Sequence, residues 1–226
     1  FRPGNRGRVR RPGKGGCDPR IPPMPMRQDI RPIKAELRSR FKALRTGLSP
    51  AEKDEMDLKI LSRVMNLWQY RDSQTILTYV STAIEVDTRR LIEKSLQAGK
   101  QVAVPRCVPG TREMEFYLIR SLDELSPGTF GVLEPDPDKS ALFTDFSKGL
   151  CIVPALSFDF QGYRLGYGKG YYDRFLARFG GSTVGLCYDS CMVRNLPAGR
   201  YDQPVHLIVT QRKTLPGAGV AWRGKG

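Results

Sequence analysis

The chain has 226 residues, 40% of them hydrophobic and 27% charged, and its formal net charge is +14. This length and composition are typical of one soluble α/β domain, and the longest apolar run, 150–156, is too short to span a membrane. The five cysteines are odd in number and scattered, and the single histidine is His206, so neither a disulfide framework nor a zinc site is expected. The sequence therefore predicts a protein of a reducing compartment, which we take to be the cytoplasm.

Much of the positive charge lies at the N-terminus. Residues 1–29 contain eight Arg or Lys against two Asp, a net +6, and alternate these with Gly and Pro without apolar periodicity. Such a segment cannot form a core, so we expect a disordered basic tail. Met26 resembles a natural start, and no apolar signal-peptide core precedes it. The tail is thus either an artefact of start-site choice or a basic transit or RNA-binding arm.

Two helices are predicted next. Apolar residues recur at helical spacing over 30–45, which predicts a first helix. Lys34 and Arg38 lie one turn apart on one face of that helix, and a solvated basic face is the ordinary interpretation of such a pair. The Ser-Pro-Ala-Glu motif at 49–52 combines a capping box with proline at the first helical position. It predicts a second helix that ends near Trp68.

Strands then alternate with helices. Strands are predicted over 75–80, 101–105, 114–119, 150–154, 183–187 and 207–210. A helix is predicted over 88–98, a turn and proline-rich loop over 130–139, and a disordered tail over 213–226. This alternation predicts a doubly wound, mostly parallel sheet with helices on both faces, in a single α/β domain over 30–212. Ligands bind at the carboxyl ends of strands in such sheets, where Glu85, Arg106 and Asp202 are expected.

A glycine-rich stretch follows the predicted strand at 150–154 and leads into a helix predicted from Tyr171. Gly166, Gly168 and Gly170 alternate, which permits positive φ angles and lets several backbone N–H groups approach one anion. The predicted helix directs the positive end of its dipole toward the same place. The stretch therefore predicts a polyphosphate site.

A structural turn is the alternative explanation of this stretch. The run matches neither the GxGxxG pattern nor the Walker A motif, and glycines alternate in ordinary turns too. A turn does not explain why four charged residues cluster with the glycines. These residues are Arg164, Lys169, Asp173 and Arg174. The charges favour the phosphate site.

The run RLGYGKGYYDR at 164–174, preceded by VPALSFD at 153–159, closely resembles the signature of the 5-formyltetrahydrofolate cyclo-ligase family, whose members are also called methenyltetrahydrofolate synthetases. Weaker similarity extends from about residue 30 to about residue 212. The resemblance implies an enzyme that uses ATP and Mg²⁺ to cyclise 5-formyltetrahydrofolate to 5,10-methenyltetrahydrofolate, through a phosphorylated formyl intermediate, with ADP and phosphate as the other products.

The resemblance also implies a role for each matching residue. Lys169 and Arg164 would be catalytic, and Asp173 and Asp202 would bind Mg²⁺. The ATP site would consist of Lys34, Arg38, Arg164, Leu165, Gly166, Tyr167, Gly168, Lys169, Gly170, Tyr171 and Tyr172. The folate site would consist of Val80, Glu85, Tyr167, Gly168, Lys169, Gly170 and Tyr171. The pair Pro105-Arg106 also resembles a family feature.

Two positions depart from the family pattern. His206 stands four residues after Asp202, where the family often has a carboxylate; we expect a neutral core or capping histidine, which puts a supporting metal role in doubt. Tyr167 stands where relatives tend to have Arg or Met. Its ring could stack on a ligand or alter the preference for the folate tail.

The charge also suggests a nucleic-acid-binding protein as an alternative class. However, the basic residues are concentrated in the tail, and no aromatic RNA-binding motif is present. We therefore expect a small-molecule folate substrate and no specific nucleic acid, no membrane association and a monomeric protein.

The tail is expected to be dispensable. A chain that begins at Met26 should keep its melting temperature and its ATP-dependent activity, because no periodic apolar residue upstream contributes to a core. Loss of folding in this shortened chain would assign the tail to the domain.

Overall fold

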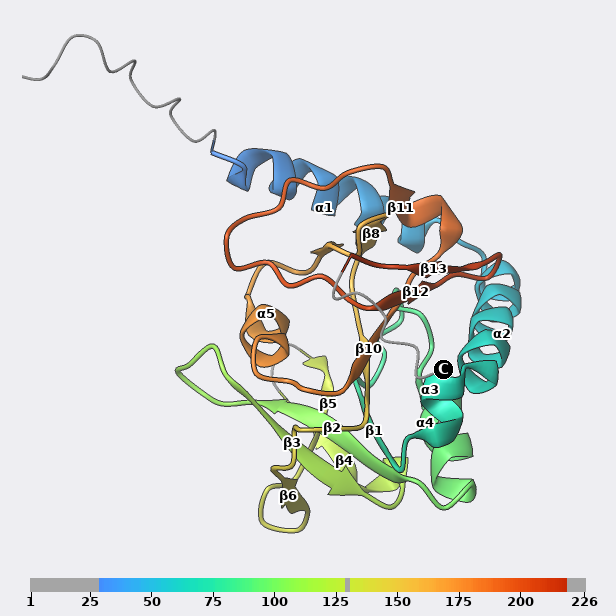
Figure 1. Ribbon diagram of the computed structural model, residues 1–226, viewed down its shortest axis with the longest axis vertical. Helices are drawn as coiled ribbons and strands as arrows, with labels where there is room; N and C mark the ends of the chain where they lie inside the picture. Colours follow the sequence, from blue (N-terminus) through green and yellow to red (C-terminus); the bar gives the residue numbers. More distant parts are fainter. Residues whose placement is uncertain (1–28, 129–130, 219–226) are drawn as a thin grey trace, which may run out of the picture.

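The computed structural model describes residues 29–128 and 131–218 of the chain (Figure 1). All of the predicted basic tail except Asp29 therefore lies outside the described residues, as does the C-terminal end of the chain from residue 219. None of the described helices is long and apolar enough to cross a membrane.

The described residues form a central eight-stranded sheet with the order β13-β12-β10-β7-β1-β2-β3-β6 (Figure 1). Its strands are β1 (Thr75–Thr78), β2 (Gln101–Cys107), β3 (Met114–Ile119), β6 (Ala141–Phe143), β7 (Leu150–Val153), β10 (Ser182–Leu186), β12 (Leu207–Val209) and β13 (Thr214–Pro216). The strands from β12 to β2 pair in parallel, and the antiparallel pairs lie toward the two edges. The predicted mostly parallel sheet is confirmed.

Helices cover both faces of the sheet. They are α1 (Arg31–Thr46), α2 (Pro50–Asn66), α3 (Trp68–Asp72), α4 (Arg89–Gln97) and α5 (Tyr171–Leu176). Ile92 of α4 packs in one core cluster with Val102 and Val104, whereas Ala103 belongs to the cluster that contains Phe175 of α5. Because successive strand residues point to opposite faces, α4 and α5 lie on opposite sides of β2, as Figure 1 shows.

The winding direction reverses at β1, which lies between β7 and β2. The chain passes from β1 through α4 to β2 on one side, and later continues from β7 to β10 and β12 on the other. Loops that leave the carboxyl ends of β1 and β7 therefore diverge, which opens a crevice between them. This crevice is where a ligand is expected in such a fold.

Several element boundaries differ from the prediction. The second helix ends at Asn66, because Leu67 adopts an extended conformation (ψ 138°) before α3 begins. The helix that begins at Tyr171 ends at Leu176, although its apolar stripe continues to Phe179, which packs against the core from beyond the helix. Apolar spacing reports which residues are buried and does not show where the backbone stops being helical.

The prediction of a disordered C-terminal tail from residue 213 is wrong for the first part of that segment, because residues 214–216 form strand β13. Strand β13 pairs with β12 in an antiparallel ladder, and the Gly217 amide donates to the His206 carbonyl at 2.8 Å. Leu215 packs against the core. A three-residue strand is too short to show a period of two, and it forms because it completes hydrogen bonds at the edge of the sheet.

Short strands outside the main sheet were also missed, for the same reason. They are β4 (Leu125–Pro127), β5 (Leu133–Pro135), β8 (Ser157–Asp159), β9 (Arg164–Leu165) and β11 (Met192–Val193). Two short 3₁₀ segments accompany them at 122–124 and 189–191. The β4–β5 hairpin and the β8–β9 hairpin both carry residues of the candidate site.

Candidate functional site

A cleft of about 620 Å³ lies at the carboxyl ends of β1 and β7. Every residue that the sequence predicted for the ATP, folate and metal sites lines this one cleft. Arg106 does not line it, although its neighbours Pro105 and Cys107 do. The structure thus brings together segments that are far apart in the chain, from α1, the loop after β1, the glycine-rich loop and the segment around Asp202.

The β8–β9 hairpin delivers the glycine-rich loop to the cleft, and buried Asp159 holds this hairpin. One carboxylate oxygen of Asp159 accepts hydrogen bonds from the amides of Gln161 (2.9 Å) and Tyr163 (3.0 Å). The other accepts from the amide of Leu196 at 3.0 Å. A carboxylate that satisfies three backbone donors fixes the turn, so the loop that follows β9 begins from a rigid base.

The glycine-rich loop follows the prediction in part. Gly168 (φ 96°) and Gly170 (φ 76°) adopt the positive φ angles that the alternation permits, and Gly166 does not. Gly166 directly follows the extended strand β9, and nothing lies within 4 Å of the position that a Cβ would occupy. The Arg38 Nε donates to its carbonyl at 2.9 Å, which joins α1 to the loop.

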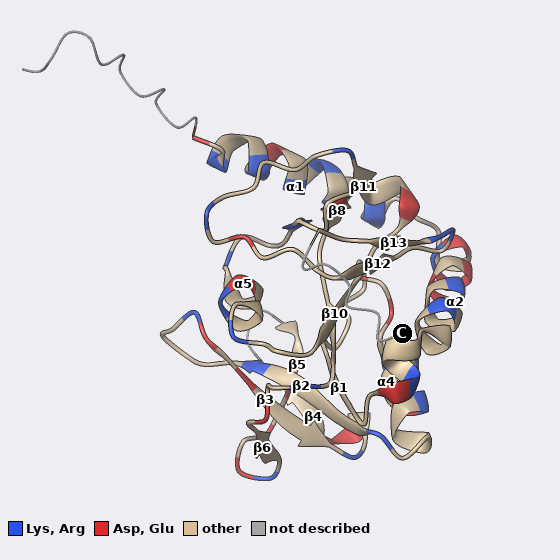
Figure 2. Cartoon of the chain, viewed as in Figure 1, with Lys and Arg blue, Asp and Glu red and all other residues tan. Residues whose placement is uncertain are grey.

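Positive side chains line the α1 side of the cleft. Lys and Arg recur along α1 (Figure 2), and Lys34 forms an ion pair of 2.6 Å with Asp202. The Lys42 ammonium lies 5.5 Å from the centre of the Tyr167 ring. Lys169 is an exposed side chain at the cleft. This concentration of positive charge favours an anionic ligand.

Arg164 is buried beneath the loop and is bound to Asp173. Its side chain is only 5% exposed, and its guanidinium forms an ion pair of 2.8 Å with Asp173 and donates to the Gln203 carbonyl at 3.1 Å. It also lies 5.9 Å from the centre of the Tyr172 ring. Asp173 is therefore the counter-ion of a buried arginine as well as a first-turn acid of α5, and a contact between Arg164 and ATP stays a prediction.

The two acids predicted to bind Mg²⁺ fit that ion in part. Asp173 makes its contacts with the described residues through Oδ1, and Asp202 makes its contacts, with Lys34 and the Gly199 amide, through Oδ2. Each carboxylate therefore keeps a second oxygen for a ligand. No group of three or more His, Cys, Asp or Glu in the described part of the chain could hold a metal ion. Mg²⁺ commonly binds one or two protein carboxylates and takes phosphate oxygens of a substrate as further ligands, and two acids suit such a site.

Aromatic side chains and the Glu85 carboxylate also line the cleft. Glu85 is only 7% exposed, and its Oε2 accepts from the amide (2.8 Å) and hydroxyl (2.9 Å) of Thr82. Burial, with the nearby charge of Glu85, raises the pKa of Tyr79 and of Tyr167, so both phenols stay neutral. The Tyr172 hydroxyl is buried without a hydrogen-bond partner among the described residues. An aromatic recess with one carboxylate suits a flat heterocycle that carries N–H donors.

Some residues of the cleft were missed by the sequence analysis. They are Lys42, Tyr79, Thr82, Ile84, Cys107, Met114, Val132, Leu133, Glu134 and Pro154. Lys42 continues the Lys34–Arg38 spacing by one more turn of α1, so its position was available as a signal. Glu134 reaches the cleft from the β4–β5 hairpin, where its Oε1 accepts from the Cys107 amide at 3.2 Å. No local pattern shows that a hairpin folds over a site.

His206 is a structural histidine, as expected. Its Nδ1 accepts a hydrogen bond from the Thr183 amide at 3.0 Å, which links the start of β12 to β10, and it does not line the cleft. Burial lowers the pKa of His206, and because its Nδ1 accepts a hydrogen bond, the imidazole is neutral and carries its proton on Nε2.

This histidine should make stability depend on pH. Because its folded pKa lies below the ordinary value of 6.5, the neutral form stabilises the fold fully above that value, and the stability is lost as the pH falls through the folded pKa. The melting temperature should therefore fall more between about pH 8 and about pH 5.5 in the parent chain than in His206→Gln, whose amide does not titrate. Parallel curves for the two proteins would contradict this assignment.

Comparison with known proteins gives a consistent result. The model of the 5-formyltetrahydrofolate cyclo-ligase family matches residues 30–211. A protein of Caenorhabditis elegans named probable 5-formyltetrahydrofolate cyclo-ligase is 25% identical, and the match covers 82% of this chain and 96% of that protein. The 5-formyltetrahydrofolate cyclo-ligase of Escherichia coli K12 is 30% identical, with 75% and 95% covered.

A solved structure supports the same relationship. The 5,10-methenyltetrahydrofolate synthetase of Aquifex aeolicus superimposes with a TM-score of 0.69 at 30% identity, and the match covers 85% of this chain and 98% of that one. The family match includes the whole of the cleft, from Lys34 to Asp202. The chain therefore belongs to the 5-formyltetrahydrofolate cyclo-ligase family.

Proposed function

We propose that this protein catalyses the ATP- and Mg²⁺-dependent cyclisation of 5-formyltetrahydrofolate to 5,10-methenyltetrahydrofolate, with release of ADP and phosphate. One observation carries the proposal: all of the family-motif residues converge on one cleft, which combines basic side chains of α1 with aromatic side chains and the Glu85 carboxylate. The basic side chains suit phosphates, whereas the aromatic side chains and the carboxylate suit a pterin. The cytoplasmic location and the monomeric state stay predictions.

The two substrates would meet at the glycine-rich loop. ATP would lie against Lys34, Arg38 and Lys169, with its phosphates near the exposed backbone of the loop. The folate would lie against Val80 and Glu85, with the carboxylate accepting from N–H groups of the ring. Residues 167–171 are shared between the two predicted sites, which suits a reaction in which a phosphoryl group passes from one substrate to the other.

The reaction would then proceed in two steps. The formyl oxygen attacks the γ-phosphorus, and the bond between that phosphorus and the ADP oxygen breaks. Nitrogen 10 next attacks the activated carbon and gives up its proton, and the carbon–oxygen bond breaks to release phosphate, which carries that proton away. Phosphorylation converts a poor leaving oxygen into a good one, and Lys169 would stabilise the negative charge on the transferred group.

Mg²⁺, when bound, would neutralise charge on the phosphates, and Asp173 and Asp202 are the residues proposed to hold it. The contribution of the chain itself is to orient these acids. Buried Arg164 fixes Asp173, and Lys34 fixes Asp202. Each ion pair uses one carboxylate oxygen, which leaves the other oxygen of each acid for the ion.

The direct test is to mix the purified protein with Mg-ATP and 5-formyltetrahydrofolate and to follow the absorbance of the methenyl product. We expect product formation that requires both ATP and Mg²⁺ and releases one phosphate per product. Reactions without ATP and reactions without Mg²⁺ are the controls. No methenyl product from folded protein at saturating substrates would overturn the proposed function.

A further inference from the structure

Arg45 joins the two loops that form the folate side of the cleft. It lies in the last turn of α1 and is only 2% exposed. Its Nη1 donates to the Ile84 carbonyl at 3.1 Å, and its Nη2 donates to the carbonyls of Ala155 (2.7 Å) and Leu156 (3.0 Å). Ile84 belongs to residues 81–86, here named the Glu85 loop, and the other two residues follow β7. One guanidinium therefore spans the crevice where the winding of the sheet reverses.

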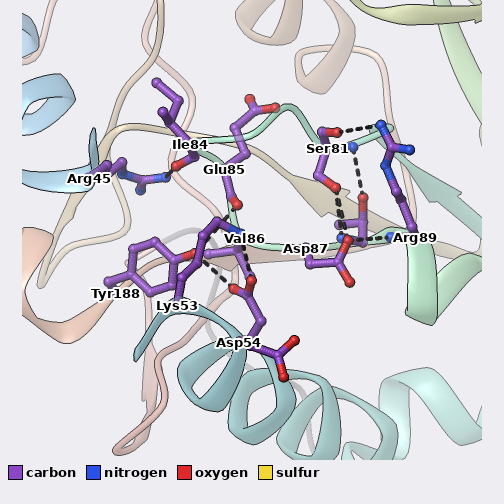
Figure 3. A network of polar contacts seen from close by, with 12 residues as sticks. Arg45, Lys53, Asp54, Ser81, Ile84, Glu85, Val86, Asp87, Arg89 and Tyr188 are labelled. Carbon is purple, nitrogen blue, oxygen red and sulfur yellow. Dashed lines mark hydrogen bonds and ion pairs between the residues drawn. The ribbon is translucent and has the colours of Figure 1, made fainter. Parts of the chain in front are cut away.

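Tyr188 supports the same loop from a third strand. It follows β10 and is fully buried, and its ring lies 5.2 Å from the Arg45 guanidinium. Its hydroxyl donates to Asp57 Oδ1 at 2.8 Å and lies 3.4 Å from the Glu85 carbonyl oxygen. Asp57 is held in turn by Lys53 at 2.6 Å. Figure 3 shows Arg45 and Tyr188 on the backbone side of the loop, while the Glu85 side chain points away from them.

We propose that Arg45, supported by Tyr188, is a positioning residue for Glu85. Neither side chain lines the cleft, so neither touches a substrate there. A planar guanidinium with donors in fixed directions can hold three carbonyls in one geometry, which a flexible ammonium cannot do. Arg45 therefore sets the distance between the Glu85 loop and the segment after β7, and through it the position of the Glu85 carboxylate.

The burial of this charge favours a positioning role over simple packing. Removing a cation from water is costly unless it is paired or fully hydrogen-bonded, and no carboxylate contacts Arg45 among the described residues. Its Nε is also buried without an acceptor there. The gain that offsets this cost lies in the three bridged carbonyls, one from Ile84, which lines the cleft, and two from the segment that follows β7.

The inference rests on the proposed function for its kinetic part. Arg45→Lys keeps the charge but loses the planar set of N–H donors. We therefore expect the KM for 5-formyltetrahydrofolate to rise about tenfold. The KM for ATP should change less than about twofold, because Arg38 still anchors the glycine-rich loop through the Gly166 carbonyl. Tyr188→Phe keeps the ring and removes only the hydroxyl, so it should give a smaller change of the same kind.

Arg63→Lys is the matched control. Arg63 also donates to two backbone carbonyls, those of Gln211 (3.4 Å) and Arg212 (2.7 Å), but it ties α2 to a segment outside the cleft. This variant should lower the melting temperature, but it should not raise the KM for 5-formyltetrahydrofolate more than the KM for ATP. If Arg45 only stabilised the fold, its variant would behave like this control.

Hydrogen exchange of the folded proteins tests the structural part without any turnover. Amides of residues 81–87 should exchange about tenfold faster in Arg45→Lys than in the parent chain or in Arg63→Lys, while amides of α4 stay unchanged. Tyr188→Phe gives the same test should Arg45→Lys fail to fold.

Unchanged exchange at 81–87, or equal rises of both KM values, would overturn the inference. If the parent chain does not convert 5-formyltetrahydrofolate, the proposed function fails, and the exchange result still decides the role of Arg45 in holding the loop.

Discussion

Lys169→Ala is expected to lower kcat/KM for ATP by about 100-fold to 1,000-fold while leaving the melting temperature nearly unchanged. The side chain is exposed at the cleft, on a loop whose backbone is set by glycines and by the hairpin below it, so little packing is lost. Its charge, by contrast, lies among the residues that line the cleft, where the phosphates are proposed to bind. The measurement is steady-state kinetics over a range of ATP concentrations, with a thermal melt of each variant.

Lys148→Ala is the matched control for this variant. Lys148 is also exposed, but it lies just before β7, at the end of the sheet opposite the cleft. Its replacement should change neither the rate nor the melting temperature. An unchanged rate in Lys169→Ala would show that the glycine-rich loop is a structural turn and would remove Lys169 from the site.

The second large effect is expected at Asp173, where Asp173→Asn should both destabilise the protein and weaken its response to Mg²⁺. An acid that only complements the dipole of a helix contributes about 0.3–1 kcal/mol. Asp173 does more, because it neutralises Arg164, whose side chain is 5% exposed. Leaving that buried cation with an amide in place of a carboxylate should reduce the free energy of unfolding by roughly 1–3 kcal/mol.

Asp202→Asn separates the metal role from the structural role. Its partner Lys34 is more exposed than Arg164, so the loss of stability should be smaller. If the two acids share one Mg²⁺, both variants should need a higher Mg²⁺ concentration for half-maximal rate, by about tenfold or more. Activity against Mg²⁺ concentration, with melting temperatures, measures both quantities.

Asp189→Asn is the control for loss of a paired acid outside the cleft. Asp189 lies 3.8 Å from Lys213 and 3.9 Å from Arg212, and it does not line the cleft. Its variant should leave the Mg²⁺ curve unchanged. A lower melting temperature with an unshifted Mg²⁺ curve in Asp173→Asn would assign Asp173 to the support of Arg164 alone.

Much of the site was predictable because its signals are local. The run at 164–174 concentrates glycines and charges within a few residues, and a single helix face carries Lys34 and Arg38. The parallel core was predictable as well, because strands buried on both faces are continuous apolar runs and alternate with helical spacing. These properties depend on neighbours in the chain, and the sequence by itself determined them.

Tertiary structure decided which of these residues bind one another. Lys34 and Asp202 were predicted for different roles, yet they form an ion pair across 168 positions of the chain. Arg45 carried no signal at all, because its acceptors lie 39 to 111 residues away. Strand β13 and the strands of the β8–β9 hairpin are too short to show a period, and they form through hydrogen bonds to the neighbouring strand of the same hairpin. Apolar periodicity determines what is buried, but contacts between polar groups distant in sequence form only once the sheet has brought its loops together.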